Sequence, residues 1–208
     1  MAMQKEKKTQ RVIFFGDSIT EAAVNEGGYI KQLQNKLEKL PNATNYHLIG
    51  AGVSGNKVYD LYLRLEEDVL KRKPSIVVIY VGINDVWHKQ SSHTGTDLDK
   101  FEKFYTAIIK KIQAQNSKVI VCTPTMIGEK KNATNEMDKE LDLYAAEIRQ
   151  ISKRNNCKLV DLRQAFTDYL RINNPQNSEE GILTTDGVHL NNAGNKLVAD
   201  EMSKILGW

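Results

Sequence analysis

Four short polar segments of the sequence carry the residue types that acyl transfer requires. Ser18 supplies a hydroxyl within Gly-Asp-Ser-Ile-Thr, Asn84 supplies a side-chain amide, and Gly55 lies in the stretch Gly-Val-Ser-Gly-Asn. His189 follows Asp186 at a spacing that lets the carboxylate accept a hydrogen bond from the imidazole Nδ1–H. A hydroxyl, a base, an orienting acid and several N–H donors are the groups that attack by a serine nucleophile needs.

The elements that must position these groups alternate along the chain. Short apolar runs rich in Val and Ile predict strands buried on both faces, at residues 11–15, 46–50, 76–81, 119–122 and 158–160. Stretches with helical spacing lie between them, at residues 28–40, 58–72, 98–115 and 138–155, followed by a short helix at 165–172 and a final one at 192–206. No repeat, low-complexity stretch or linker interrupts this pattern.

Strands that alternate with helices predict a three-layer α/β/α fold with a five-stranded parallel sheet. The flavodoxin-like strand order 2-1-3-4-5 fits five such strands, and ligands of this architecture bind beyond the carboxyl ends of the strands. Three of the polar segments directly follow the first three predicted strands, and the fourth precedes the last helix. We therefore expect all four segments to meet at one edge of the sheet.

Length and charge predict one domain with a short basic extension. The chain has 208 residues with a net charge of +3, and the first eleven residues account for all of that charge. We interpret residues 1–10 as a basic tail and residues 11–208 as a single domain. Because the rest of the chain is neutral overall, nothing predicts the basic face that a nucleic-acid partner would require.

Composition also bears on membranes, compartment and metals. No apolar run approaches the ~18 residues of a membrane helix, so we expect no membrane partner. The N-terminus lacks the apolar stretch of a secretory signal, which predicts a cytoplasmic protein, whereas removal of an upstream signal would place it in the periplasm or outside the cell. The two cysteines, Cys122 and Cys157, form no CxxC pair and are interpreted as small apolar residues, so no metal site is expected.

The polar segments resemble the conserved blocks of a known enzyme family. They are Gly16-Asp17-Ser18, Gly55, Gly82-Ile83-Asn84-Asp85 and Asp186-Gly187-Val188-His189. Their types and order are similar to the four blocks of the GDSL, or SGNH, hydrolases, and they span residues 16–189. The one departure is Ile19 where the family has leucine. The resemblance implies ester hydrolysis without a metal or an organic cofactor.

The resemblance also implies a role for each residue. Ser18 would attack the ester carbonyl, His189 would act as the base and then as the acid, and Asp186 would fix the imidazole. The oxyanion would be met by the backbone N–H groups of Ser18 and Gly55 and by the side-chain amide of Asn84.

Alternatives exist for several of these assignments. Ser18 could be only a helix N-cap. Asp85 precedes His88 at the same spacing as the main pair, which makes a rival dyad. Asp161 could reach the same imidazole, although we prefer it as the N-cap of a helix starting near Leu162.

Two further interpretations concern the surroundings of the site. Asp17 is interpreted as bracing the turn with backbone hydrogen bonds. Trp87 and the loop at residues 124–137 are expected to border the substrate pocket, with Trp87 as a substrate-binding residue.

The substrate hypotheses differ in acyl length and in class. The stretches around Gly55 and His189 look like those of small single-domain bacterial SGNH esterases, which implies a short-chain, acetyl esterase acting on a carbohydrate or another small-molecule ester. A second hypothesis is a lysophospholipase or thioesterase with a longer acyl pocket. A third, from another class, is a binding module that kept the fold without catalysis.

Overall fold

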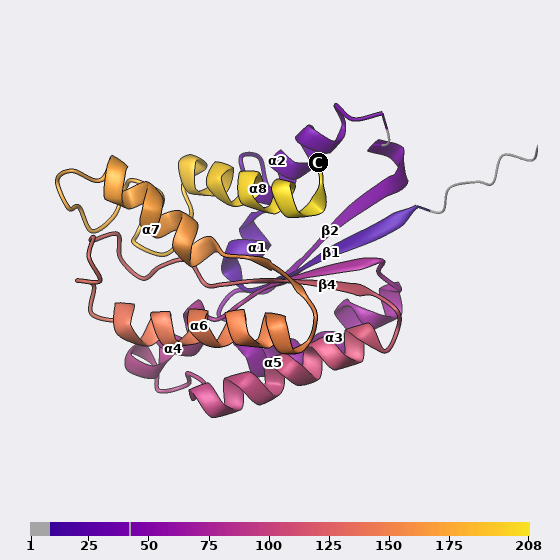
Figure 1. The fold of residues 1–208 in the computed structure, drawn as a ribbon, viewed down its shortest axis with the longest axis horizontal. Helices are drawn as coiled ribbons and strands as arrows, with labels where there is room; N and C mark the ends of the chain where they lie inside the picture. Colours follow the sequence, from indigo (N-terminus) through magenta and orange to yellow (C-terminus); the bar gives the residue numbers. More distant parts are fainter. Residues whose placement is uncertain (1–8, 42) are drawn as a thin grey trace, which may run out of the picture.

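The computed structural model describes residues 9–41 and 43–208 (Figure 1). The predicted basic tail lies almost entirely in residues 1–8, outside this part of the chain. The division into a tail and one domain therefore stays a prediction.

A five-stranded parallel sheet forms the centre of the fold. Its strands are β1 (Gln10–Gly16), β2 (Tyr46–Gly52), β3 (Ile76–Tyr80), β4 (Lys118–Cys122) and β5 (Lys158–Val160). They lie in the order β2-β1-β3-β4-β5, all parallel, which confirms the predicted topology. Val12, Ile13, Phe14 and Phe15 of β1 have no exposed surface, as expected of a central strand covered on both faces.

Helices cover the two faces of the sheet in separate layers. Figure 1 shows α2 (Tyr29–Leu37), α7 (Leu162–Asn173) and α8 (Asn192–Leu206) on one side, and α3 (Val58–Asp68), α5 (Leu98–Gln113) and α6 (Asp138–Arg154) on the other. Side chains alternate along a strand, so Val12 and Phe14 pack in the first layer while Ile13 and Phe15 pack in the second. Within the described residues, no helix is both long and apolar enough to cross a membrane.

Two short helices were not predicted from the sequence. Helix α1 (Ser18–Ala22) begins two residues after β1, and α4 (Ile83–Ser91) begins three residues after β3. Both start inside the polar segments, where the residue types indicated turns. Helix α7 begins at Leu162, as the interpretation of Asp161 as an N-cap predicts, although the helical spacing alone indicated residues 165–172. Helix α3 ends at Asp68 before a short 3₁₀ turn.

Glycines at the ends of β1 and β2 allow α1 to pack directly against the sheet. Gly16 lies opposite Gly52 in the strand register. A Cβ on Gly52 would lie 2.0 Å from the backbone N of Glu21 and 2.6 Å from the carbonyl oxygen of Asp17. Only a residue without a side chain fits there, so glycine at this position lets α1 lie against the end of β2.

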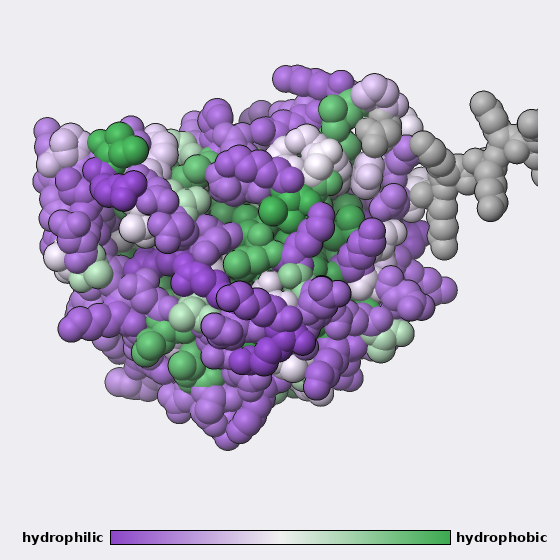
Figure 2. Space-filling model, viewed as in Figure 1, coloured by the Kyte–Doolittle hydropathy of each residue, from purple (hydrophilic) through white to green (hydrophobic). Residues whose placement is uncertain are grey.

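Apolar side chains gather in a few places on the face that Figure 2 shows. Hydrophilic side chains predominate on this face, and an apolar area lies beside α8 (Figure 2). A hollow of about 530 Å³ that includes Ile205 and Leu206 of α8 is also lined by Gln10, Ile76 and Lys118, the first residues of three strands. This hollow therefore opens at the amino ends of the strands, opposite the edge where the polar segments meet.

Candidate active site

Ser18, His189 and Asp186 form a continuous hydrogen-bonded chain. Ser18 Oγ lies 3.1 Å from His189 Nε2, and His189 Nδ1 lies 2.7 Å from Asp186 Oδ2. The other carboxylate oxygen, Asp186 Oδ1, accepts from the backbone N–H groups of Val188 at 3.0 Å and His189 at 2.7 Å. The structure thus brings together three residues that the sequence separates by as many as 171 positions.

Asp186 carries its negative charge at neutral pH. Partial burial works to raise its pKa, but the hydrogen bonds from the His189 side chain and from two backbone N–H groups hold the pKa below its usual value. An ionised carboxylate in this position can hold the imidazole in one tautomer and stabilise its protonated form.

Asp17 shapes the corner between β1 and α1. Its Oδ1 accepts from the backbone N–H of Ile19 at 3.0 Å, so Asp17 is the N-cap of α1 and Ser18 is its first residue. The interpretation of Asp17 as a brace is confirmed, and the alternative that Ser18 is only an N-cap is wrong. Burial raises the pKa of Asp17 to about 7, against the lowering effect of the Ile19 N–H and of His189.

The three expected oxyanion donors lie at the ends of neighbouring strands. Ser18 follows β1, Gly55 follows β2 with a φ of +76°, and Asn84 is a buried residue in the first turn of α4 after β3. Asn84 Nδ2 donates to the carbonyl oxygen of Asn56 at 3.1 Å, which fixes one N–H of the amide and leaves a second N–H on the same nitrogen.

Two charged residues that sequence reasoning missed hold the loop around Gly55. Lys57 is almost fully buried, and its Nζ donates to the Gly55 carbonyl oxygen at 2.9 Å. The Glu21 carboxylate, on α1, accepts from the backbone N–H of Ser54 at 2.9 Å and from its hydroxyl. Hydrogen bonds therefore hold the loop both internally, through Lys57, and against the helix that begins at Ser18, through Glu21.

Arg64 of α3 joins the same loop to the sheet. Its guanidinium donates to the carbonyl oxygens of Gly16 at 2.7 Å and Ala51 at 3.1 Å, and to Asn56 Oδ1 at 2.6 Å. It also lies over the Phe15 ring, 4.5 Å from the centroid. The signal that could have found it is its place on the buried side of α3, since helical residues three apart share a face and Arg64 follows Leu61 at that spacing.

The rival pair Asp85 and His88 is not formed. Asp85 is fully buried, accepts from the backbone N–H of Val58 at 3.1 Å, and has its pKa raised to about 7 by that burial. His88 Nδ1 faces Lys57 Nζ at 3.4 Å instead, and burial together with the Lys57 charge lowers the pKa of His88. Within the described residues, no hydrogen bond joins the two side chains.

Asp161 is engaged elsewhere, which confirms its interpretation as a helix N-cap. It accepts two hydrogen bonds from Arg149, at 2.7 and 2.9 Å, and one from Thr123 Oγ1 at 3.0 Å. It also caps α7 by accepting from the backbone N–H of Gln164.

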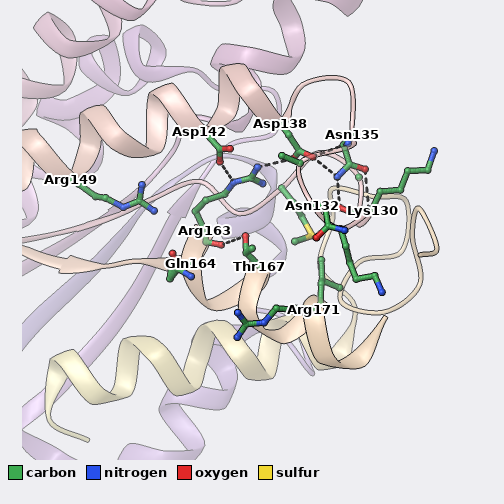
Figure 3. Close-up of a pocket in the computed structure, with 15 residues that line it drawn as sticks. Lys130, Asn132, Asn135, Asp138, Asp142, Arg149, Arg163, Gln164, Thr167 and Arg171 are labelled. Atoms are coloured by element: carbon green, nitrogen blue, oxygen red, sulfur yellow. Dashed lines mark hydrogen bonds and ion pairs between the residues drawn. The ribbon is translucent and has the colours of Figure 1, made fainter. Parts of the chain in front are cut away.

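A separate cavity of about 320 Å³ lies next to Arg149 (Figure 3). Arg163 contributes to its wall and forms ion pairs with Asp138 and Asp142, both at 2.7 Å. Residues of the predicted 124–137 loop line this cavity, but none of the predicted catalytic, oxyanion or substrate-binding residues does.

Trp87 borders a second hollow, beside the hydrogen-bonded chain. Its ring lies edge-on to that of His189, with 6.5 Å between the centroids. The hollow measures about 530 Å³ and is also lined by Asp186 and by Ile127 and Met137 of the loop after β4. The loop thus borders a hollow beside Asp186, and a role for this loop and for Trp87 in substrate binding stays a prediction.

Cysteines and metal ligands do not gather near these residues. Cys122 is buried and Cys157 is half-buried, both as free thiols, and burial raises the pKa of Cys157 to about 11. In the part of the chain that the structure describes, no three His, Cys, Asp or Glu side chains are grouped to hold a metal ion.

The fold and the site together define an SGNH-type ester hydrolase. The GDSL-like lipase/acylhydrolase family matches residues 14–197, and the chain belongs to this family of carboxylic ester hydrolases. The acetylxylan esterase of Geobacillus stearothermophilus is 29% identical over 214 residues, which cover 96% of this chain and 94% of that protein.

Solved structures of acetylxylan esterases resemble the whole described fold. The acetyl xylan esterase AlAXEase shares 56% identity and a TM-score of 0.92, over 94% of this chain and 99% of that one. A catalytic mutant of the Geobacillus stearothermophilus enzyme Axe2 shares 28% identity and a TM-score of 0.86, over 99% of this chain and 97% of that one.

The buried carboxyl of Asp17 predicts a particular dependence of stability on pH. Its folded pKa of about 7 exceeds the ordinary value of 3.8, so between these values the folded protein keeps a proton that the unfolded chain has released. The contribution of this group to the free energy of unfolding therefore falls as the pH rises from about 4 to about 7. We expect Asp17→Asn, which can still cap α1, to gain stability relative to the native protein as the pH rises from about 4 to about 7.

Urea unfolding of both proteins at several pH values measures this difference. A difference in the free energy of unfolding that stays constant across the window would show that Asp17 does not titrate there.

Proposed function

We propose that this protein is a serine esterase that removes acetyl groups from carbohydrate or other small-molecule esters. The observation that carries the proposal is the chain of hydrogen bonds from Ser18 Oγ through His189 to Asp186, at 3.1 and 2.7 Å. In this arrangement, a base lies within reach of a hydroxyl proton and an acid orients the base.

The residues act in a fixed order. Ser18 Oγ attacks the acetyl carbonyl while His189 Nε2 takes its proton, and His189 then returns a proton to the leaving alcohol. A water molecule, activated by the same imidazole, releases acetate from Ser18. The backbone N–H groups of Ser18 and Gly55 and the second N–H of Asn84 Nδ2 stabilise the oxyanion, and the loss of one such donor typically costs about 2.7–4 kcal/mol.

Catalytic mutants of a relative support the assignment of Ser18, His189 and Asp186. In the Geobacillus stearothermophilus enzyme Axe2, the mutated catalytic positions are a serine, an aspartate and a histidine, with the last two three positions apart. Asp186 and His189 have the same spacing in this chain.

The surroundings of Ser18 and His189 favour a small acyl group. Most residues around the hollow beside them are polar or charged, among them Lys130, Glu179 and Glu180. The hollow rich in aliphatic side chains opens at the other edge of the sheet, where an acyl chain on Ser18 does not reach. This arrangement favours acetyl over the long chains of the second hypothesis, and membership of a hydrolase family argues against the third, a non-catalytic binding module.

A series of p-nitrophenyl esters tests the acyl length. We expect kcat/KM to be highest for the acetyl ester and to fall at least about tenfold by eight carbons, since one methylene changes binding by about 1–3 kcal/mol. Release of acetic acid from acetylated xylooligosaccharides tests whether the enzyme acts on a carbohydrate ester. A maximum at eight carbons or more would establish the longer-chain hypothesis instead.

Removal of the nucleophile or the base should abolish turnover. We expect Ser18→Ala and His189→Ala to lower kcat by about 10⁴-fold or more, because the first removes the nucleophile and the second removes the base that activates it. His88→Ala is the matched control, since its ring faces Lys57, and we expect it to keep most of the activity. Turnover by a folded Ser18→Ala protein at the native rate would refute the mechanism.

Replacement of the two candidate acids should have opposite outcomes. Asp186→Asn keeps the shape of the side chain but favours the wrong imidazole tautomer, so kcat should fall about 10⁴-fold. Asp161→Asn should leave kcat near the native value and lower stability by about 1–3 kcal/mol, because Arg149 loses its partner. Steady-state kinetics and urea unfolding of both variants distinguish these effects, and the reverse pattern would make Asp161 the catalytic acid.

A further inference from the structure

Glu129, in the loop after β4, is a fully buried carboxylate with four hydrogen bonds. It accepts from three successive backbone N–H groups, those of Ile182 at 2.7 Å, Leu183 at 2.7 Å and Thr184 at 2.6 Å. It also accepts from the Thr184 hydroxyl at 2.6 Å. All four donors belong to one turn of the segment that leads to Asp186.

The charge of Glu129 is met by backbone dipoles and not by a cation. Among the residues that the structure describes, no lysine or arginine forms an ion pair with Glu129, and the adjacent Lys130 pairs with Glu179 instead. A buried carboxylate is costly unless it is fully hydrogen-bonded. Three consecutive N–H groups that converge on one anion form a nest, which holds the backbone of the turn in one conformation.

The segment that this nest holds has little regular structure of its own. Between α7 and α8, the only pairing in the described residues is an isolated bridge between Thr184 and Leu190. Asp186 and His189 both lie inside that bridge. Their position therefore depends on individual hydrogen bonds, some within the segment, such as that from the Thr185 N–H to the His189 carbonyl oxygen at 2.8 Å, and others from outside it.

Hydrogen bonds continue from Glu129 to the residues beside the imidazole. Thr184 Oγ1, which donates to Glu129, accepts from the backbone N–H of Gly187 at 3.0 Å. The neighbouring Gly128 donates its N–H to the Gly187 carbonyl oxygen at 2.8 Å. Gly187 is thus held on both sides, directly after Asp186.

We propose that Glu129 is a positioning residue, whose carboxylate holds the 182–187 turn so that His189 stays within hydrogen-bonding distance of Ser18. The inference rests on the proposed function, since it assumes that Asp186 and His189 act on Ser18. Glu129 touches neither the serine nor the substrate hollow, so its effect passes through the turn.

Glu129→Gln is the direct test. The amide keeps one acceptor oxygen but places an NH₂ group against N–H donors, so the turn loses part of its anchor. With p-nitrophenyl acetate, we expect kcat to fall at least about tenfold with KM within about twofold, because the loss concerns the transition state and not binding. The low-field proton resonance of the His189–Asp186 hydrogen bond should weaken or shift in the same protein.

Asp161→Asn is the matched control, because Asp161 also accepts four hydrogen bonds but lies outside the turn. We expect it to lower Tm without a change in kcat or in the low-field resonance. A folded Glu129→Gln protein with native kcat and an unchanged resonance would overturn the inference. The inference would also be overturned if kcat fell in both Glu129→Gln and Asp161→Asn in proportion to the loss of Tm in each.

Thr184 provides a second pair of variants if Glu129→Gln does not fold. Thr184→Val removes the hydroxyl that links Glu129 to Gly187, and kcat should fall severalfold, whereas Thr184→Ser keeps the hydroxyl and should keep kcat. Equal activity of the two would overturn the inference. Failure of the proposed function is distinguishable, because it would appear as full activity in His189→Ala and Asp186→Asn.

Discussion

The hydrogen bond between Ser18 and His189 is the contact on which the site depends, and its two partners are held in different ways. Ser18 begins a helix that lies directly on the ends of β1 and β2, where the contact with Gly52 leaves no room for a side chain. His189 lies in an irregular segment with one isolated bridge. A distance of 3.1 Å between such partners requires that the irregular side be fixed by specific polar contacts.

Buried or half-buried polar groups at the carboxyl ends of the strands hold the other side of the site, the backbone around Ser18 and Gly55. Arg64 donates hydrogen bonds to carbonyl oxygens at the ends of β1 and β2, and Asp85 accepts a hydrogen bond from the N–H of Val58 at the start of α3. Burial raises the pKa values of both Asp17 and Asp85 to about 7, so these carboxyls resist ionisation where the site needs well-ordered backbone. The hydrogen bonds they accept offset part of the cost of burying them.

The sequence predicted the sheet from local information, and it predicted that Ser18, Asp186 and His189 meet from the spacing of the last two and from the resemblance of four separate blocks to a known family. Strands buried on both faces produce apolar runs that need no knowledge of the partner strand, and Asp186 and His189 are three residues apart. The short helices α1 and α4 escaped prediction because they begin in polar segments that also fit turns. Arg64 and Glu129 escaped because they have partners as far as 48 and 55 residues away in sequence, which only the fold brings close.

The exposure of Asp186 and His189 explains why backbone contacts carry so much of the arrangement. Their side chains are 51% and 41% exposed, so water screens the attraction between carboxylate and imidazole. Two unit charges 4 Å apart in bulk water interact by only about 1 kcal/mol, far less than in a dry interior. The orientation of the imidazole must therefore come from well-placed hydrogen bonds more than from the attraction between charges. Asp186 Oδ1 accepts the N–H groups of Val188 and His189, which locks the carboxylate to the same turn as the ring that it orients. The position of the Asp186–His189 pair therefore depends on the position of this turn. The turn itself is held by its hydrogen bonds to the buried carboxylate of Glu129.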